Sequence, residues 1–339
     1  MLGCVGILKK VNLAIIGATG MVGSNFIKIL QERNFPINNI YFFASARSAS
    51  KAVHYNGQKH LIQELNENSF KDKDINIGLF SAGGGLSALY APLLVEAGGV
   101  AIDNSSHFRM HNDVPLVVPE VNPDDINCHS GIIANPNCST IQAVVALSPL
   151  HKAYGIKRVI YNTYQAVSGS GMAGVNDLQK GLATGAAPKN YPHPIANNVL
   201  PQVDVFEENG YTKEELKMIN ETRKILRCDD LKITATCVRV PVLNGHSESI
   251  NVEFNNIFKM DDVIDILSKS PGVKLENDFS IGQYPMPISV DNTDHVYIGR
   301  IRRDQSAENC LNMWVVADNL RKGAATNAIQ IAELLLDKL

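Results

Sequence analysis

The sequence has no pair of cysteines at CxxC spacing, and its six cysteines, at positions 4, 128, 138, 228, 237 and 310, stand far apart. This spacing excludes a zinc cluster and a disulfide framework, and dispersed thiols are typical of a reducing compartment. No segment is apolar and long enough to cross a bilayer, and no basic region precedes the short apolar stretch at the N-terminus. We therefore expect a cytoplasmic protein with no secretory signal, whose first residues form a short extension ahead of the first strand.

An excess of charge of either sign is also lacking. The chain has 34 acidic and 31 basic residues, a formal net charge of −3. Nothing in this balance indicates a nucleic-acid or anionic-membrane partner. Apolar residues make up 45% of the 339 positions, which is enough to form the cores of two globular domains. No internal repeat or low-complexity tract interrupts them.

The first part of the chain, up to about residue 133, alternates strand and helix patterns. The expected strands cover residues 12–16, 40–44, 75–80 and 100–103, and the expected helices cover 21–31 and 86–97, the second after a break at 83–85. Repeated β-α-β units of this kind predict an α/β domain with a parallel, doubly wound sheet.

After residue 138 the pattern changes to longer runs with period-two alternation. Such runs predict an antiparallel or mixed sheet with helices on one face, an α+β domain. A proline-rich extended loop is expected at 188–201 and an amphipathic helix at 320–339. We expect residues 1–137 with 320–339 to form one domain and 138–319 the other. The expected strands are 158–166, 232–240, 247–254, 296–303 and 310–317, and the helices are 141–154, 212–226 and 260–269.

A glycine-rich turn joins the first strand to the first helix and consists of Gly17, Ala18, Thr19, Gly20, Met21, Val22 and Gly23. Glycine lets a backbone approach a pyrophosphate, which then meets the N–H groups of the helix N-terminus. A tight turn without a ligand is the alternative, but the strand-turn-helix context favours a dinucleotide. The residues at the end of the second strand include Ser45, Arg47 and Ser48 and no acid. This favours NADP over NAD, because these side chains suit a 2′-phosphate. An arginine on a solvated loop remains the other interpretation.

Cys138 comes directly before a predicted helix, in the segment Asn135-Pro-Asn-Cys-Ser-Thr140. The positive end of a helix dipole lowers the pKa of a thiol, and free N–H groups there would hold an oxyanion. A buried structural cysteine is the alternative, and position alone leaves both open.

Six segments carry a family resemblance, namely GATGMVG at 17–23, DNSSHFRM at 103–110, VPEVN at 118–122, NPNCST at 135–140, YQAVSGSG at 164–171 and RVPVLNGH at 239–246. Their types and order resemble aspartate-semialdehyde dehydrogenase from residue 12 to the C-terminal helix. The resemblance implies a Rossmann-type nucleotide-binding domain and a catalytic and dimerisation domain like the C-terminal domain of glyceraldehyde-3-phosphate dehydrogenase. It also implies a dimer or tetramer that uses NADPH to reduce aspartyl phosphate to aspartate semialdehyde and phosphate, in the biosynthesis of lysine, threonine and methionine.

The same resemblance implies roles for individual residues. Cys138 is the nucleophile that forms a thioester, His246 the general acid and base, and Gln165 the residue that orients the substrate. Arg239 binds the α-carboxylate, Glu221 the ammonium group, and Lys224 the phosphate. The remaining matches are Arg109 and Asn137 at phosphate and substrate positions, and Ser168, Gly169 and Asn319 beside the cofactor.

Each of these residues taken alone has an ordinary structural explanation. Arg239 suits a surface strand end, His246 a turn, and the pair Glu221 and Lys224 an exposed helix face. We expect Asn244-Gly245 to be a hairpin turn that brings Arg239 and His246 near each other.

Two other functions would share the nucleotide domain. An N-acetyl-glutamyl-phosphate reductase would share the thioester, and a non-catalytic NADP sensor would leave Cys138 without a purpose. His107 and His111 lack the HExxH pattern, so a loop is expected there and no metal site. Asn197 stands where the family usually has phenylalanine, a departure in the loop at 188–201.

Overall fold

The computed structural model describes residues 10–336 and 338, and the chain forms two compact units. The first contains the residues up to Pro119, Pro123–Asn135 and those from Ala325 onward; the second contains Glu120–Asn122 and Pro136–Ala324. Most of the extension predicted ahead of the first strand falls in residues 1–9, outside the described residues. No helix in the described part of the chain is both long and apolar enough to span a membrane.

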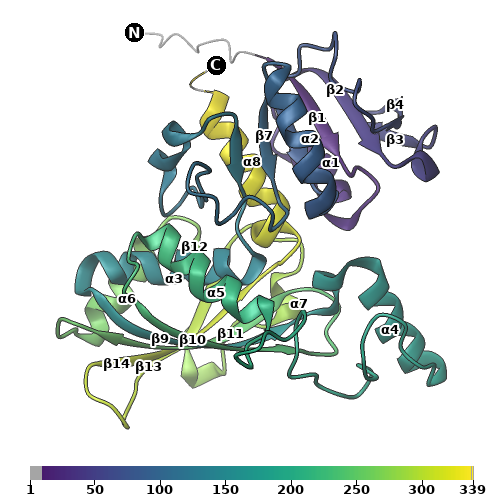
Figure 1. The fold of residues 1–339 in the computed structure, drawn as a ribbon. Coiled ribbons are helices and arrows are strands. Elements are labelled where there is room, and N and C mark those ends of the chain that lie inside the picture. Colours follow the sequence, from purple (N-terminus) through teal and green to yellow (C-terminus); the bar gives the residue numbers. More distant parts are fainter. Residues whose placement is uncertain (1–9, 337, 339) are drawn as a thin grey trace. The chain divides into compact units, whose positions relative to one another are not determined.

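The first unit is built on a six-stranded sheet in the order β5-β2-β1-β6-β7-β8, in which every neighbouring pair is parallel. The strand order reverses beside β1, and in such sheets ligands bind at the carboxyl ends of the strands at this point. The glycine turn follows β1 there. The strands are β1 (Val11–Ile16), β2 (Ile37–Ala44), β5 (Gln63–Glu64), β6 (Ile77–Phe80), β7 (Val100–Asp103) and β8 (Ile132–Ala134), and the helices are α1 (Met21–Glu32), α2 (Gly84–Glu96) and α8 (Thr326–Leu336) (Figure 1).

The four strands and two helices predicted for this unit are present, with α2 beginning two residues earlier than expected, at Gly84. A hairpin of β3 (Ala52–Tyr55) and β4 (Gln58–Leu61) was not predicted. Its turn is Asn56-Gly57 with both φ angles positive, a strong hairpin signal that the polar flanking strands obscured. The C-terminal α8 contributes Ala328, Ile329 and Ile331 to the core of this unit.

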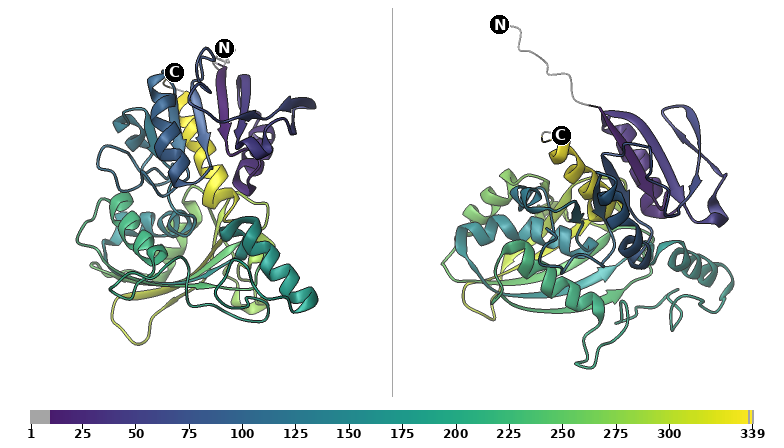
Figure 2. Two further views of the ribbon diagram at one scale, coloured as in Figure 1. Left: turned by 45° about the vertical axis from the view of Figure 1, so that its right-hand side comes forward. Right: turned by 45° about the horizontal axis from the view of Figure 1, so that its top comes forward.

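The second unit has a six-stranded mixed sheet in the order β10-β9-β11-β14-β13-β12, and helices α3 and α5 cover one of its faces, which we call the inner face (Figures 1 and 2). Helix α3 is buried on almost every side, so it forms the centre of this unit. The strands are β9 (Ile156–Gln165), β10 (Lys232–Arg239), β11 (His246–Phe254), β12 (Val273–Leu275), β13 (Val296–Arg303) and β14 (Cys310–Ala317), and the helices are α3 (Cys138–Tyr154), α4 (Gly171–Thr184), α5 (Lys213–Leu226), α6 (Met260–Lys269) and α7 (Pro287–Val290).

The predicted hairpin at Asn244-Gly245 is wrong. Strand β9 lies between β10 and β11, parallel to the first and antiparallel to the second. The chain after β10 crosses the end of β9, where the N–H groups of Val167 and Ser168 donate to the carbonyls of Val242 and Leu243 at 2.9 and 3.1 Å. Period-two alternation predicts strands but not their partners, which are fixed by the tertiary fold.

Two further departures have local causes. The helix expected from residue 320 begins instead with a π-helical turn, Arg321–Ala325, and α8 follows it. Asn197 has a φ of 54°, a left-handed conformation that asparagine adopts far more readily than phenylalanine. The extended loop predicted at 188–201 is confirmed, since no helix or strand is assigned within it.

The inner face of the second sheet buries one acid, Glu248 on β11, opposite Thr163 on β9 and Val315 on β14. Glu248 is 0% exposed, and neither carboxyl oxygen has a hydrogen-bond partner among the described residues. Burial raises the pKa of Glu248 well above its ordinary value of 4.5. The group therefore stays protonated and neutral in the fold, because an unpaired carboxylate there would lose its hydration without compensation.

The burial of Glu248 predicts that Glu248→Gln increases the stability of the fold relative to the wild type, and that this increase grows with pH. The unfolded chain releases the Glu248 proton above pH 4.5 while the folded chain keeps it, so folding is opposed more strongly as the pH rises. The variant has no such proton, and its advantage in the unfolding equilibrium should grow about tenfold per pH unit up to the folded-state pKa. Urea unfolding of both proteins between pH 5 and pH 8 measures this; a gap that does not change with pH would contradict the assignment.

Candidate active site

Cys138 is the first residue of α3, and Asn137 is the N-cap. The side-chain oxygen of Asn137 accepts hydrogen bonds from the N–H groups of Ser139 and Thr140, at 2.9 and 3.3 Å. Cys138 is partly exposed, whereas Cys237 and Cys310 are buried. The predicted position at a helix N-terminus is confirmed, and the thiol stands at the positive end of the α3 dipole.

The same cap corrects one expectation. The N–H groups of Ser139 and Thr140 are taken by Asn137, so they are not free to hold an oxyanion. A substrate oxygen would have to displace the cap to reach them.

Asn137 also joins α3 to α5. Its backbone N–H donates to Glu221 at 2.7 Å, and its side-chain amide donates to Glu214 at 2.8 Å. Helix α5 is itself fixed at its start by a capping box between Thr212 and Glu215. Glu215 accepts a further bond from the N–H of Cys237 on β10 at 2.9 Å, so the start of α5 is fastened to the sheet.

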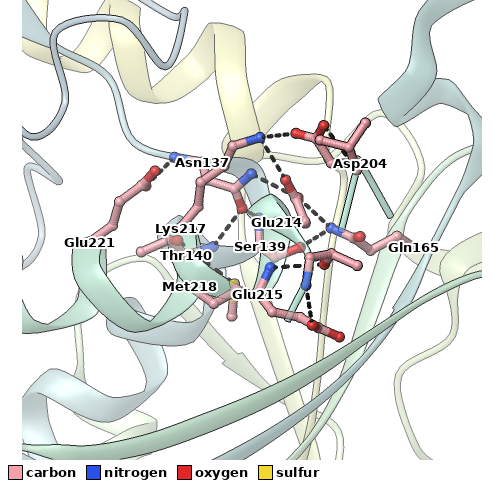
Figure 3. Close-up of polar contacts among 12 residues, drawn as sticks. Asn137, Ser139, Thr140, Gln165, Asp204, Glu214, Glu215, Lys217, Met218 and Glu221 are labelled. Carbon is pink, nitrogen blue, oxygen red and sulfur yellow. Dashed lines mark hydrogen bonds and ion pairs between the residues drawn. The ribbon is translucent and has the colours of Figure 1, made fainter. Parts of the chain in front are cut away.

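Glu214 lies at the centre of this network, 6% exposed (Figure 3). Its carboxylate accepts from Gln165 at 2.9 Å, as well as from Asn137, and pairs with Lys217 at 3.1 Å. Burial alone would raise the pKa of Glu214, but the Lys217 charge and the hydrogen bonds from Gln165, Asn137 and Lys217 lower it to about 2. Glu214 is therefore a carboxylate at neutral pH. Lys217 also pairs with Asp204 at 2.8 Å.

His246 begins β11 and is 0% exposed. Its Nδ1 accepts the N–H of Ala166 at 3.1 Å, so in the neutral ring the hydrogen is on Nε2. Burial and the neighbouring Arg239 charge lower the pKa of His246 to about 3, against the opposing effect of Glu214. The imidazole is thus a neutral hydrogen-bond donor through Nε2.

Arg239 and Gly169 lie beside this imidazole. Arg239 donates to the carbonyl of Ala166 at 2.7 Å. A Cβ added to Gly169 would lie 2.9 Å from the Arg239 guanidinium and 3.2 Å from Nε2 of His246. The loop after β9 therefore approaches both side chains so closely that only glycine fits.

Three buried polar atoms in this region have no hydrogen-bond partner among the described residues. They are Oε1 of Gln165, Nε of Arg239 and Nε2 of His246. Gln165 holds its amide group toward Ser139, the residue after Cys138, at 2.6 Å. Buried polar groups are normally paired, so one acceptor and two donors left open near a helix-tip cysteine are typical of a site for a polar substrate.

The glycine turn in the other unit has the geometry of a nucleotide site. Gly17 has a φ of 89°, and an added Cβ would lie 2.7 Å from the carbonyl oxygen of Ser81. A Cβ on Gly23 would lie 2.2 Å from the carbonyl oxygen of Gly17, so α1 packs directly on the turn. Gly20 caps α1 without a side-chain acceptor, which leaves the helix N-terminus suited to phosphate. Thr19 is exposed, and Met21 and Val22 are half-buried.

Three other residues predicted to bind the cofactor follow β2. Ser45 comes directly before a short 3-10 helix, Ala46–Ser48, which contains Arg47 and Ser48. Ser45 and Arg47 are exposed, and Ser48 is buried. Arg109, in the same unit, is 7% exposed and donates to the carbonyls of Asn135 and Asn104 at 2.9 and 2.8 Å.

The second unit contains the predicted catalytic residues Cys138, Gln165 and His246, and its network includes one acid that the sequence analysis did not single out, Glu214. The pattern Glu-x-x-Lys occurs twice in α5, at 214–217 and 221–224, seven residues apart and so on one helix face. Both glutamates contact Asn137, and Glu214 also accepts a hydrogen bond from Gln165. Lys224 is half-buried. Sequence spacing gives no reason to choose between the pairs.

Asn319 and the pair His107 and His111 were also singled out from the sequence. Asn319 is 3% exposed, accepts from the N–H of Gly245 and donates to Ser168, each at 2.9 Å. The loop predicted around His107 and His111 is confirmed, because no helix is assigned between β7 and Pro123.

Comparisons with known proteins agree with this arrangement. Residues 12–129 match the model of the semialdehyde dehydrogenase NAD binding domain, and residues 147–322 match the semialdehyde dehydrogenase dimerisation domain. The aspartate-semialdehyde dehydrogenase of Aquifex aeolicus is 52% identical over 96% of this chain and 97% of its own.

Solved structures are similar over the same extent. That of aspartate semialdehyde dehydrogenase II from Vibrio cholerae has a TM-score of 0.94 at 46% identity, covering 97% of this chain and 99% of its own, and the same protein has also been solved complexed with ASA. The enzyme of Candida albicans, solved with NADP, has a TM-score of 0.77 at 26% identity, covering 96% and 98%.

The fold and site define an oxidoreductase with a Rossmann-type nucleotide-binding domain and a second domain that carries a helix-tip cysteine. Within that class, the chain belongs to the aspartate-semialdehyde dehydrogenase family.

The network around Glu214 predicts an acid-dependent stability loss. Because the folded-state pKa is below the ordinary 4.5, the carboxylate stabilises the fold above pH 4.5, and that contribution is lost as the pH falls toward 2. Glu214→Gln should cost about 2 kcal/mol at pH 7, since it weakens charge-assisted hydrogen bonds and leaves Lys217 with Asp204 alone. Denaturant unfolding from pH 7 to pH 3 should show a constant deficit above pH 4.5 that narrows as the pH falls from 4.5 to 3; a deficit that does not change between pH 5 and pH 3 would contradict the assignment.

Proposed function

We propose that this protein reduces L-aspartyl 4-phosphate with NADPH to L-aspartate 4-semialdehyde and phosphate, through a thioester on Cys138. The reaction supplies the aspartate-family amino acids lysine, threonine and methionine. The observation that carries the proposal is the position of Cys138 at the tip of α3, in one unit with the open polar atoms of Gln165, Arg239 and His246. NADPH, when bound, supplies the hydride.

The cysteine divides the reaction into two steps. The Cys138 thiolate attacks the acyl carbon, the bond to the phosphate oxygen breaks, and phosphate leaves with the electron pair. The thioester that remains is a better hydride acceptor than a carboxylate. Hydride addition makes the thioester oxygen an alkoxide; as this oxygen re-forms the carbonyl, the carbon–sulfur bond breaks with its electron pair on sulfur, and the thiolate and the aldehyde are released.

His246 acts in this scheme through Nε2. Because Nδ1 is held by the N–H of Ala166, the neutral ring presents a donor to negative charge on the sulfur or on the substrate oxygen. The low pKa of His246, which burial and Arg239 bring to about 3, keeps that donor neutral across the physiological range. This donor replaces the helix N–H groups that Asn137 occupies.

Substrate recognition is assigned to charged groups around the cysteine. Arg239 presents a guanidinium fork to the α-carboxylate. We assign the ammonium group to Glu221 and the phosphate to Lys224, as the resemblance implies. Glu214 accepts hydrogen bonds from Gln165 and Asn137 and holds both side chains in place. Arg109 and Asn137 keep their proposed phosphate and substrate roles.

NADP rather than NAD is the proposed cofactor. The turn at 17–23 suits its pyrophosphate, and Ser45, Arg47 and Ser48 suit its 2′-phosphate, with no acid among the five residues at 44–48. The NADP in the Candida albicans relative supports this preference. Ser168, Gly169 and Asn319 are assigned to the nicotinamide end.

The assembly is proposed to be a homo-oligomer, a dimer or tetramer, which the match to a dimerisation domain supports. Exposed apolar side chains of the second unit, such as Ile281 and Ile288, offer surface for such contacts. The five described cysteines are thiols and not disulfides, and a thiol nucleophile needs a reducing compartment, so we assign the enzyme to the cytoplasm.

Cys138→Ser tests the function directly. Formation of NADPH from aspartate semialdehyde, NADP and phosphate should fall by a factor of about 10³ or more, because a serine hydroxyl is a far weaker nucleophile than a thiolate. The dissociation constant of NADP, measured by fluorescence titration, should stay within about twofold. Near-normal turnover of the variant would contradict the thioester. Wild-type activity only with N-acetyl-glutamate semialdehyde would instead favour the sister reductase.

A matched pair of variants tests the recognition of the ammonium group. Glu221→Gln should raise the KM for aspartate semialdehyde by about tenfold or more, because a neutral amide loses the charge that pairs with the ammonium. Glu214→Gln, on the same helix face, should change KM less, since Glu214 bonds the side chains of Gln165 and Asn137. Steady-state kinetics decide this, and the reverse order of effects would move the role to Glu214.

A further inference from the structure

The segment Asp318–Gly323 connects β14 to α8 and contains the start of the π-helical turn Arg321–Ala325. Interruptions of this kind in a helix often occur at functional sites. The polar side chains of this connector are buried: Asp318 is 2% exposed, Asn319 3%, Arg321 4% and Lys322 0%. A simple link between a strand and a helix does not require so many buried charged groups.

One end of the segment touches the cysteine. A Cβ added to Gly323 would lie 3.0 Å from Cβ of Cys138 and 3.4 Å from its Cα. The φ of Gly323 is not in the left-handed region, so backbone conformation does not explain the glycine. What Gly323 provides is room, and any side chain there would have to displace Cys138 or the turn.

The other part of the segment holds the histidine. Asn319 accepts the N–H of Gly245, the residue before His246, at 2.9 Å. It also donates to Ser168 at 2.9 Å, next to Gly169. The Cβ of Asn319 lies 3.5 Å from the position of a Gly323 Cβ, so both contacts are made from one turn.

Three anchors hold this turn in place. The carboxylate of Asp318 accepts the N–H groups of Leu320, Arg321 and Asn292, at 2.9, 3.0 and 2.8 Å. Arg321 pairs with Asp294 at 2.8 Å. Lys322 pairs with Glu120 at 2.6 Å. Losing either partner of such a pair would leave a buried charge, so the turn resists displacement.

We propose that Asp318–Gly323 is a positioning segment that sets the separation of Cys138 from His246, with Gly323 and Asn319 as its two contact points. The assignment of those two residues as nucleophile and donor rests on the proposed function, but the geometric coupling does not. Reacting groups lose much of their effect when they are displaced by about 1 Å. A small shift of this turn would therefore alter the thiol without touching the substrate.

The test measures Cys138 itself, without cofactor or substrate. The full-length protein is treated with iodoacetamide across pH 5 to pH 10, and alkylation of the peptide containing Cys138 is quantified by mass spectrometry. Gly323→Ala should shift the pH profile and change the rate at neutral pH by about tenfold. Gly85→Ala is the control, because a Cβ there meets no atom within 4 Å. Equal profiles for the wild type and Gly323→Ala would overturn the proposal.

A second pair keeps the test decisive if Gly323→Ala does not fold. Asn319→Gln retains both an amide acceptor for the N–H of Gly245 and an amide donor to Ser168, so it should shift the alkylation profile less than Asn319→Ala. Each change is repeated in a His246→Asn background, where the shift caused by Gly323→Ala or Asn319→Ala should disappear. A shift of the same size in that background would show a structural effect unrelated to His246 and would overturn the proposal.

The outcomes also separate this proposal from the proposed function. A wild-type protein that fails to turn over aspartate semialdehyde, yet shows a His246-dependent alkylation profile sensitive to Gly323→Ala, would reject the substrate and keep the positioning segment. A wild-type protein that turns over aspartate semialdehyde, but whose alkylation profile is not changed by His246→Asn, would keep the proposed substrate and reject the positioning segment.

Discussion

The hydrogen bonds of Asn137 determine where Cys138 stands. Its backbone N–H donates to Glu221 and its side-chain amide donates to Glu214. Its side-chain oxygen accepts from the N–H groups of Ser139 and Thr140, and its backbone carbonyl accepts from the N–H of Ile141 at 2.9 Å. One residue thus caps α3 and fastens that helix to α5, whose own start is fastened to β10. Because the nucleophile is the next residue along the chain, its position follows from contacts made by both helices and the sheet.

The second unit also contains buried groups whose charge states are set by the side chains around them. Glu214 remains a carboxylate because Lys217 and three hydrogen bonds outweigh the cost of burial, which leaves its pKa at about 2. Two other buried groups are neutral because burial shifts their pKa values in opposite directions: it raises the pKa of Glu248 and, with Arg239, lowers the pKa of His246. The region around the thiol therefore has buried glutamates on α5, a guanidinium and a neutral imidazole donor, an arrangement that suits an amino-acid substrate with both charges at its α-carbon.

Most elements were predictable because each has a strong local signal. The parallel strands are short apolar runs between helices, and the helix after Cys138 is clear from its periodicity. The pairing of β9 between β10 and β11 was not predictable, since alternation carries no information about partners. For the same reason the hydrogen bonds that Glu214 accepts from Gln165 and Asn137 could not be predicted, because they join side chains far apart in the sequence.

The central claim is that Cys138 carries the acyl group. The most direct measurement is mass spectrometry of the intact protein and its peptides after incubation with aspartate semialdehyde and NADP in the absence of phosphate. The account predicts an aspartyl adduct on the peptide that contains Cys138. When NADPH is then added, the adduct should disappear and aspartate semialdehyde should form. An adduct on another cysteine, or turnover on addition of phosphate by protein that never forms an adduct, would contradict the account.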